Sequence, residues 1–262
     1  MDFKKPLIIG MGEIGKPLYE IVRGIYPDVQ WLDIETKEIT GKIDVLHICI
    51  PYSSSFVTDV VKYINCYQPN LTIIESTVAP LTTSKIYAEV GGNICHSPVR
   101  GRNATGFKWG FFTFTKFIGG TKPAAGRMAE EYYRSLGFKT RICGSSLETE
   151  FMKIINTSYY GLCIAWFQEI DRICKKYNLD VSAIKEFIKS TEDDCGGKVS
   201  RPTYIGGYIE GHCVIPNALL LQQAFQSKFI DVLLESNEKK RNEMNSEKKR
   251  VVNNRIDKND VL

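Results

Sequence analysis

The stretch Pro6-Leu7-Ile8-Ile9-Gly10-Met11-Gly12-Glu13-Ile14-Gly15 decides which fold we expect for this chain. Four apolar residues end in the pattern Gly-x-Gly-x-x-Gly, and residues 16–23 then have the pattern of a helix. In such a unit the first glycine allows a tight turn, the second lets the backbone approach a pyrophosphate, and the third lets the helix pack on the strand. The helix N-terminus adds free N–H groups and a positive dipole end. The stretch therefore predicts a dinucleotide-binding turn formed by residues 10–15.

An acidic residue follows the glycines at the spacing that this interpretation requires. Residues 29–32 have the pattern of a second strand, and Asp33 follows it, about 20 residues beyond the glycines. A carboxylate here accepts hydrogen bonds from an adenosine ribose and repels a 2′-phosphate, so we expect NAD rather than NADP. The alternative is that Asp33 only solvates a strand end and that the glycines form a plain turn. The combination of strand, turn, helix and acid favours the cofactor site.

Apolar runs alternate with helix-like segments through the first half of the chain. Strands are predicted at residues 45–50, 71–75, 93–95, 115–118 and 140–143, with helices at 56–65, 83–89 and 123–136. This alternation predicts an α/β fold with a Rossmann-type doubly wound parallel sheet. In such sheets ligands bind at the carboxyl ends of the strands, where Pro51, Ser76 and Thr77 stand. We expect these three residues to contact the cofactor.

The second half of the chain has a helical pattern. Ser145 and Glu148 fit a capping box, and Gly161 is the only glycine or proline from there to Tyr177. One helix over this length would be about 45 Å long, too long for a sheet crossover, and indicates a smaller all-helical domain. Another helix is predicted at 181–190 and a last one from Asn217 through Leu234. The expected division is an NAD-binding domain at 1–144, a helical domain at 145–235 with a long dimerisation helix and a glycine-rich cysteine loop, and a charged, partly disordered tail at 236–262.

Composition excludes several classes of protein. The chain has 43% hydrophobic and 24% charged residues, as an ordinary globular protein has, and its net charge of +4 does not indicate a nucleic-acid partner. Its eight cysteines form no Cys-x-x-Cys pair, so we expect no metal site. The start of the sequence has no signal-peptide pattern, and no apolar run is long enough to span a bilayer. We expect a cytoplasmic protein with reduced cysteines and no membrane partner.

Four segments, in this order, carry a resemblance to a known family. They are Gly10–Gly15 with Asp33, residues 76–83 (Ser-Thr-Val-Ala-Pro-Leu-Thr-Thr), Glu150-x-x-Lys153, and Gly211-His212-Cys213. Together they resemble the UDP-glucose/GDP-mannose (nucleotide-sugar) dehydrogenases over about residues 1–235. The resemblance implies an NAD-dependent dehydrogenase acting on a CH–OH donor, similar to UDP-glucose 6-dehydrogenases, that oxidises a sugar alcohol twice. It makes Cys213 the nucleophile that attacks the aldehyde, Lys153 the charge that stabilises the oxyanion, and Thr77 a residue that positions water and cofactor.

The chain also departs from the family pattern. Val99 stands where the family has an acid, and Asn217 stands where it has an aspartate. The asparagine expected four residues after Lys153 is Thr157, with Asn156 one place earlier, so Asn156 and Asn217 become the candidate catalytic residues at these places. The sequence ends after the helix that leads to the family's C-terminal nucleotide-sugar-binding domain, so we expect this domain to be lacking. These departures leave open whether the oxidation takes two or four electrons.

Two other functions stay open. The 3-hydroxyacid dehydrogenases share the plan of a Rossmann and a helical domain and use a lysine without a cysteine, so a two-electron oxidation fits as well. A catalytically degenerate NAD-binding protein is the third possibility. In each case we expect a small-molecule ligand and a homodimer. Arg100, Arg102 and Lys108 either bind an anionic substrate or form a solvated loop, and His96, at a strand end, is either catalytic or structural.

Overall fold

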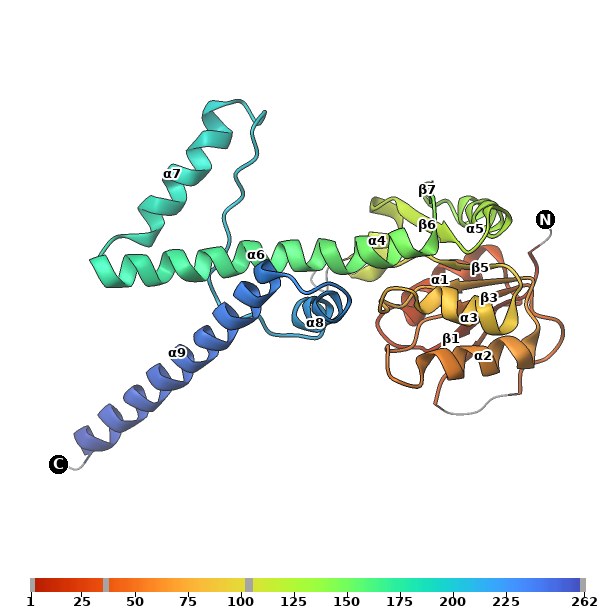
Figure 1. The fold of residues 1–262 in the computed structure, drawn as a ribbon, viewed down its shortest axis with the longest axis horizontal. Helices are drawn as coiled ribbons and strands as arrows, with labels where there is room; N and C mark the ends of the chain where they lie inside the picture. Colours follow the sequence, from red (N-terminus) through yellow and green to blue (C-terminus); the bar gives the residue numbers. More distant parts are fainter. Residues whose placement is uncertain (1–2, 35–37, 102–105, 260–262) are drawn as a thin grey trace. The chain divides into compact units, whose positions relative to one another are not determined.

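The computed structural model describes residues 3–34, 38–101 and 106–259 of the chain (Figure 1). These residues form two compact units, Met1–Lys153 and Ile154–Leu262, and each unit is described by itself.

In the described part of the first unit, seven strands form one sheet in the order β2-β1-β3-β4-β5-β6-β7. The strands are β1 (Pro6–Ile9), β2 (Gln30–Leu32), β3 (Val45–Ile48), β4 (Leu71–Ile74), β5 (Ile94–His96), β6 (Lys116–Gly120) and β7 (Thr140–Cys143). The Rossmann-type doubly wound α/β fold is thereby confirmed. The strand order reverses between β1 and β3, and ligands bind at such a switch point.

One strand pair differs from the expected parallel arrangement. β6 runs antiparallel to β5 and parallel to β7. The connection after β5 contains the short helix α4 (Phe107–Thr113), which the sequence patterns did not predict. It returns to the carboxyl end of β5, where Lys116, the first residue of β6, donates a hydrogen bond to the carbonyl of Ser97. A strand entering at this edge has to run antiparallel to its neighbour, because a parallel neighbour needs a crossover to the opposite edge.

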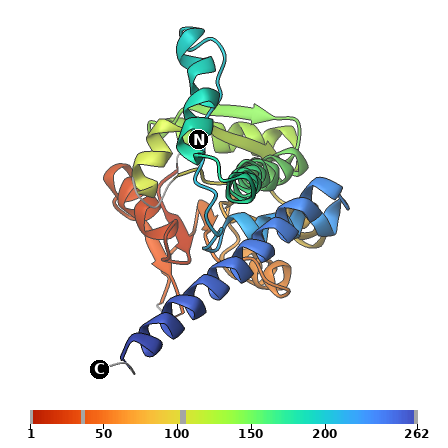
Figure 2. The ribbon, with the colours of Figure 1, turned by 90° about the vertical axis from the view of Figure 1, so that its left-hand side faces the viewer.

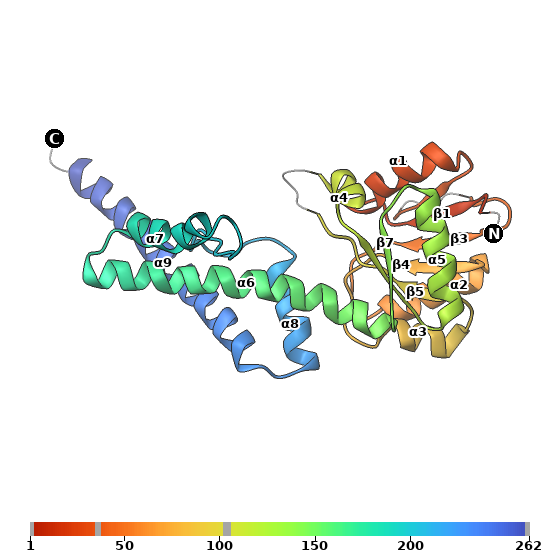
Figure 3. The same cartoon turned by 90° about the horizontal axis from the view of Figure 1, so that it is seen from above.

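Helices cover both faces of the sheet (Figure 3). α1 (Gly15–Ile25), α4 and α5 (Pro123–Ser135) pack on one face, and α2 (Phe56–Tyr67) and α3 (Thr82–Val90) pack on the other. The apolar residues of these helices recur at helical spacing, which places them on the side turned to the sheet. Burial of both faces explains why the central strands are almost continuously apolar.

A buried network of ionisable groups lies on the α5 face. Glu75, directly after β4, accepts hydrogen bonds from Lys116 Nζ (2.6 Å), His47 Nδ1 (3.1 Å) and Tyr133 Oη (2.5 Å). Nε2 of His47 lies 3.0 Å from Oη of Tyr132. Burial opposes ionisation of Glu75, but the charge of Lys116 and the hydrogen bond from His47 outweigh it and hold the pKa of Glu75 at about 2. Glu75 is therefore a paired carboxylate inside the core.

The second unit is helical. α6 (Ser146–Tyr177) is the expected long helix, and its residues 146–153 belong to the first unit. It is followed by α7 (Val181–Asp194), α8 (Val214–Ala224) and α9 (Lys228–Asn259). The cap expected before α6 is present in part. Ser145 Oγ accepts from the N–H of Glu148 (3.3 Å), whereas the Glu148 carboxylate accepts from the N–H of Gly144 (2.9 Å), one residue before the cap. The single helix predicted from Asn217 through Leu234 is wrong. Phe225 is extended, and the Gln222 side chain accepts from the N–H of Ser227, so the chain turns between α8 and α9.

α7 and α9 lie on opposite sides of α6 (Figures 1 and 2). α9 runs as far as Asn259, through most of the segment for which we expected a charged tail. Its first turns bury Ile230 and Leu233 against α6 and α8, and its later turns carry charged residues. Within the described residues, no helix combines the length and the apolar character needed to cross a membrane.

Candidate functional site

The glycine-rich turn packs α1 directly against the end of β1. Gly10 has φ +91°, a left-handed conformation that favours glycine, and a Cβ there would lie 2.7 Å from the carbonyl oxygen of Cys49. A Cβ on Gly15 would lie 1.8 Å from the carbonyl oxygen of Gly10. A Cβ on Gly12, in contrast, would meet no heavy atom within 4 Å. The first and third glycines are thus required by packing, and the second faces open space.

Asp33 reaches this turn from the next strand. Its Oδ2 accepts a hydrogen bond from the N–H of Met11 at 3.3 Å. Glu13 is exposed, and Ile14 is the half-buried residue that precedes α1. The structure therefore brings the turn and the acid together at the carboxyl ends of β1 and β2, as the spacing predicted.

Ser76 ties the carboxyl ends of two neighbouring strands together. Its hydroxyl lies within hydrogen-bonding distance of the carbonyls of Ile48 (3.2 Å) and Ile50 (2.6 Å), one at the end of β3 and one just beyond it. Pro51 follows and is exposed, while Thr77 is half-buried. These three residues lie at strand ends as expected, next to the switch point between β1 and β3.

His96 links the same edge to the start of α6. Its Nε2 donates to the carbonyl of Ser76 (3.1 Å), and its Nδ1 lies 2.9 Å from the hydroxyl of Thr149. Because a carbonyl only accepts, Nε2 carries a proton. The side chain is fully buried, and burial lowers the pKa of His96 to about 3. A neutral, buried imidazole with both nitrogens occupied favours the structural alternative for His96.

Glu150 fixes the segment that follows Thr77, a role that the sequence patterns did not reveal. Its carboxylate accepts from the N–H groups of Leu81 (2.7 Å) and Thr83 (2.8 Å) and from the Thr83 hydroxyl (2.6 Å). Burial raises the pKa of Glu150 against the opposing effect of these hydrogen bonds. The carboxylate caps the N-terminus of α3 and holds Leu81 at φ +73°, a conformation that is uncommon for leucine. Only a residue distant in sequence supplies this cap, so no local pattern announces it.

Lys153 also lies at this edge. Its Nζ donates to the carbonyl of Val99 at 2.8 Å, in the segment after β5. The neighbouring cations have partners of their own: Arg100 donates to the carbonyl of Thr115 (2.9 Å) and lies over the ring of Phe114, and Lys108 pairs with Glu20. Burial lowers the pKa of Arg100. Arg102 lies outside the described residues.

The remaining candidates lie in the second unit. Cys213 is exposed and directly precedes α8, where its carbonyl accepts from the N–H of Asn217 at 3.1 Å. The side chain of Asn217 is buried and donates to the hydroxyl of Thr157 at 3.0 Å. Asn156 is exposed on α6. Thr157 and Asn217, two of the three positions at which the sequence differs from the pattern of the resemblance, thus form a hydrogen bond with each other.

The chemistry of the site follows from these residue types. The turn at 10–15 presents open backbone at a helix N-terminus, which suits a phosphate, and Asp33 presents a carboxylate, which suits a ribose. In the part of the chain that the structure describes, no three His, Cys, Asp or Glu side chains gather as a metal ion would require.

The chain is similar in sequence and in fold to known dehydrogenases of nucleotide sugars. Residues 147–244 match the central domain of the UDP-glucose/GDP-mannose dehydrogenase family. A UDP-N-acetyl-D-mannosamine dehydrogenase of Methanococcus vannielii is 28% identical over 225 residues, 79% of this chain and 51% of the relative. The UDP-N-acetyl-mannosamine dehydrogenase Cap5O of Staphylococcus aureus has a similar fold, with a TM-score of 0.79, 19% identity, and coverage of 95% of this chain and 71% of that one.

A second type of dehydrogenase shares the fold. The 3-hydroxyisobutyrate dehydrogenase of Mycobacterium tuberculosis aligns with a TM-score of 0.69 and 15% identity, over 90% of this chain and 92% of its own. The chain spans about half the length of the M. vannielii relative. Over residues 147–244 the chain is therefore similar to the central domain of the UDP-glucose/GDP-mannose dehydrogenase family, and over most of its length it is similar to a UDP-N-acetyl-D-mannosamine dehydrogenase.

Proposed function

We propose that this protein is an NAD-dependent dehydrogenase that oxidises an alcohol of a sugar nucleotide or of a related anionic small molecule. The observation that carries the proposal is the contact between Asp33 and the N–H of Met11, beside the open backbone at Gly12. The match to the central domain of nucleotide-sugar dehydrogenases and the names of the curated relatives support the class of substrate.

The residues present fit NAD. The N–H groups at the start of α1 would hold the pyrophosphate, Asp33 would accept from the adenosine ribose, and Pro51, Ser76 and Thr77 would line the neighbouring strand ends. When bound, NAD accepts a hydride from the alcohol carbon. The negative charge of Asp33 would repel a 2′-phosphate, which favours NAD over NADP.

The chemistry on the protein side follows the family resemblance. Lys153 would stabilise the oxyanion of the substrate with its ammonium group. The thiolate of Cys213 would attack the carbon of the aldehyde product, whose oxygen then takes up a proton to give a thiohemiacetal. Thr77, Asn156 and Asn217 would position water and substrate. Oxidation of the thiohemiacetal by a second NAD, with release of its hydroxyl proton, would give a thioester, which water would cleave to a carboxylate and the free thiol.

One observation favours a two-electron oxidation as a second candidate. The side chain of Asn217 donates to Thr157, so the place of the family's aspartate is taken by an amide already engaged with a hydroxyl. Neither group is a general base for thioester hydrolysis at neutral pH. An enzyme similar to 3-hydroxyacid dehydrogenases would stop at the aldehyde or ketone and would not need Cys213.

The test begins with cofactor binding. Calorimetry should give tighter binding of NAD than of NADP, and Asp33→Ala should weaken NAD binding by about tenfold, the loss expected for a hydrogen-bonded carboxylate. Equal affinity of the wild type for both cofactors would contradict the assignment of Asp33.

Turnover is then measured with UDP-N-acetylmannosamine, UDP-glucose and a panel of hydroxy acids. Loss of all activity in Cys213→Ala supports covalent chemistry, and retained interconversion of alcohol and aldehyde supports the two-electron enzyme. If NAD binds but is not reduced with any substrate of the panel, the dehydrogenase proposal is wrong, and the protein only binds NAD. A homodimer and a cytoplasmic location stay predictions, the first of which light scattering tests.

A further inference from the structure

A polar cluster between α6 and α9 holds the segment that leads to Cys213. We call residues 206–213 the cysteine loop. Gln168 on α6 and Asn237 on α9 are both buried, with exposed fractions of 0% and 5%. Their amide groups form hydrogen bonds with the backbone of the cysteine loop.

Asn237 makes the closer contact. Its Oδ1 accepts from the N–H of Ile209 at 2.7 Å, and its Nδ2 donates to the carbonyl of Ile209 at 3.2 Å. One amide thus satisfies both backbone groups of one residue, as a neighbouring β-strand would. Ile209 is only 6% exposed and packs in an apolar cluster with Ala218 and Leu233, so its backbone groups need these partners.

Gln168 holds the loop two residues earlier. Its Nε2 donates to the carbonyl of Gly207 (2.7 Å) and lies 3.3 Å from Oδ1 of Asn237, while its Oε1 accepts from the hydroxyl of Ser236 (2.7 Å). Gly206 lies so close to α6 that a Cβ there would be 2.4 Å from the carbonyl oxygen of Phe167. The loop is therefore fixed on α6 at Gly206–Gly207 and on α9 at Ile209.

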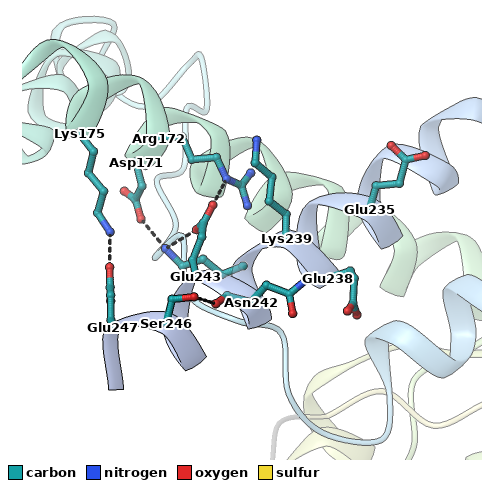
Figure 4. Close-up of a pocket in the computed structure, with 11 residues that line it drawn as sticks. Asp171, Arg172, Lys175, Glu235, Glu238, Lys239, Asn242, Glu243, Ser246 and Glu247 are labelled. Atoms are coloured by element: carbon teal, nitrogen blue, oxygen red, sulfur yellow. Dashed lines mark hydrogen bonds and ion pairs between the residues drawn. The ribbon is translucent and has the colours of Figure 1, made fainter. Parts of the chain in front are cut away.

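The position of Asn237 is itself secured. Arg172 on α6 donates to the carbonyl of Ser236 (3.0 Å), to its hydroxyl (3.0 Å) and to Glu243 (2.7 Å), and the last contact is drawn in Figure 4. The Arg172 side chain is only 12% exposed, so these bonds are partly shielded from water. α9 is thereby held against α6 on both sides of Asn237.

The cysteine loop ends at Cys213, directly before α8. The carbonyl of Cys213 accepts from the N–H of Asn217, whose side chain is anchored on Thr157 of α6. Three residues, 210–212, separate Ile209 from Cys213. Because so short a segment transmits a shift at one end to the other, the anchor at Ile209 limits where the thiol can lie.

We propose that Asn237, supported by Gln168, is a positioning residue that sets the place of the Cys213 thiol. The inference deepens the proposed function and rests on it for the role of that thiol. Asn237 acts through the backbone of Ile209 and needs no contact with substrate.

The test uses variants of similar shape that remove the hydrogen bonds, Asn237→Leu and Gln168→Met. The matched control is Asn242→Leu, a change of an exposed asparagine on the same helix. Hydrogen exchange measured by mass spectrometry should be at least about tenfold faster for residues 206–213 in Asn237→Leu and Gln168→Met than in the wild type. The reason is that each variant loses one or two hydrogen bonds, which lowers the free energy of local opening of the loop. Exchange in α6 and α8 should stay as in the wild type. Unchanged exchange in the loop, or an equal increase throughout Ile154–Leu262, would overturn the proposal.

Kinetics give the second readout. With NAD and UDP-N-acetylmannosamine, Asn237→Leu should lower kcat by about tenfold or more, since misplacement of a reacting group is costly. The KM for NAD should stay within about twofold, because the expected cofactor residues lie in the other unit. An unchanged kcat in a variant with a loosened loop would refute positioning of the thiol.

The two proposals fail in distinguishable ways. If the wild type turns over no substrate, the proposed function fails, and the alkylation of Cys213 relative to the exposed Cys195 replaces kcat as the readout. Asn237→Leu should then change this rate ratio by about threefold or more while the buried Cys174 stays unreactive. An unchanged ratio, or reaction at Cys174, would count against a positioning role.

Discussion

The two glycine-rich loops of this chain are held in place by different means. The turn at residues 10–15 is held by its own backbone, with Gly15 packed directly on the carbonyl of Gly10, and by one contact to Asp33. The cysteine loop is held by neutral side-chain amides from two helices, Gln168 and Asn237. The first loop is thus encoded within its own residues and a nearby strand, whereas the second depends on a residue 28 positions after Ile209. Four predictions test this contrast.

The largest effect should come from Gly15→Ala. The new Cβ would overlap the carbonyl oxygen of Gly10, and only a shift of the whole turn would relieve this overlap. We expect a loss above about 5 kcal/mol in the free energy of unfolding, or no folded protein, as measured by urea denaturation. Gly24→Ala, in the same helix and with open space around it, is the control and should stabilise the protein by about 0.5–1 kcal/mol. Similar losses in both variants would show that packing at Gly15 is not decisive.

Lys116→Met should have the next largest effect. It leaves the carboxylate of Glu75 buried without its cation, directly before Ser76 at the edge where the first loop lies. We expect a loss of about 3–5 kcal/mol in the free energy of unfolding. The double variant Lys116→Met/Glu75→Gln removes the unpaired charge and should recover most of it. If the single and double variants are equally unstable, the loss comes from packing and not from charge.

His96→Gln should change the pH dependence of stability. The pKa of His96 is lowered from 6.5 to about 3 in the folded protein. As the pH falls from 6.5 towards 3, the imidazole therefore takes up a proton in the unfolded chain but not in the folded protein. Stability is therefore full above pH 6.5 and decreases as the pH falls towards 3. Between about pH 5 and 6.5 the slope should be shallower in the variant, by up to about 1.4 kcal/mol per pH unit. This window lies above that of Glu75, whose stabilisation is lost only as the pH falls from 4.5 towards 2.

If the slope of stability against pH is unchanged in His96→Gln, the buried imidazole is not the acid-sensitive group.

The cysteine loop should respond differently to pH, because the amide side chains that hold it, Gln168 and Asn237, do not titrate. Hydrogen exchange of residues 206–213, corrected for its intrinsic pH dependence, should stay constant over the same window.

The smallest effect should come from Lys175→Ala. The pair of Lys175 with Glu247 links α6 and α9, but the two side chains are 64% and 61% exposed (Figure 4). We expect a change below about 1 kcal/mol in the free energy of unfolding and no change in exchange of the cysteine loop. If the cysteine loop exchanged as fast in Lys175→Ala as in Asn237→Leu, surface ion pairs and not the buried amides would hold the loop.

The same contrast explains what the sequence could predict. The strands, most helices and the end of β2 at Asp33 follow local rules of periodicity and spacing, and the structure has them there. The direction of β6 was missed because periodicity does not record strand direction. The break between α8 and α9 was missed because Phe225-Gln226-Ser227 contains neither glycine nor proline.

Within the site, the predicted residues at strand ends lie where they were expected, but the groups that hold them were not foreseen. His96 and Glu150 act on backbone groups of segments 20 and about 70 residues away in sequence. Asn237 acts on the backbone of Ile209 in the same way. A hydrogen bond to a backbone group places no demand on the partner's side chain, so no pattern of residue types reveals it.

The reversed strand β6 has a consequence for charge balance. Because β6 runs antiparallel to β5, its first residue, Lys116, lies at the carboxyl edge of the sheet and reaches both Glu75 and the carbonyl of Ser97. A parallel β6 would place that residue at the opposite edge and leave the carboxylate without its counterion. Chain topology and electrostatic neutrality are therefore coupled here, and a redesign that reverses this strand has to supply a new cation for Glu75 or remove the acid.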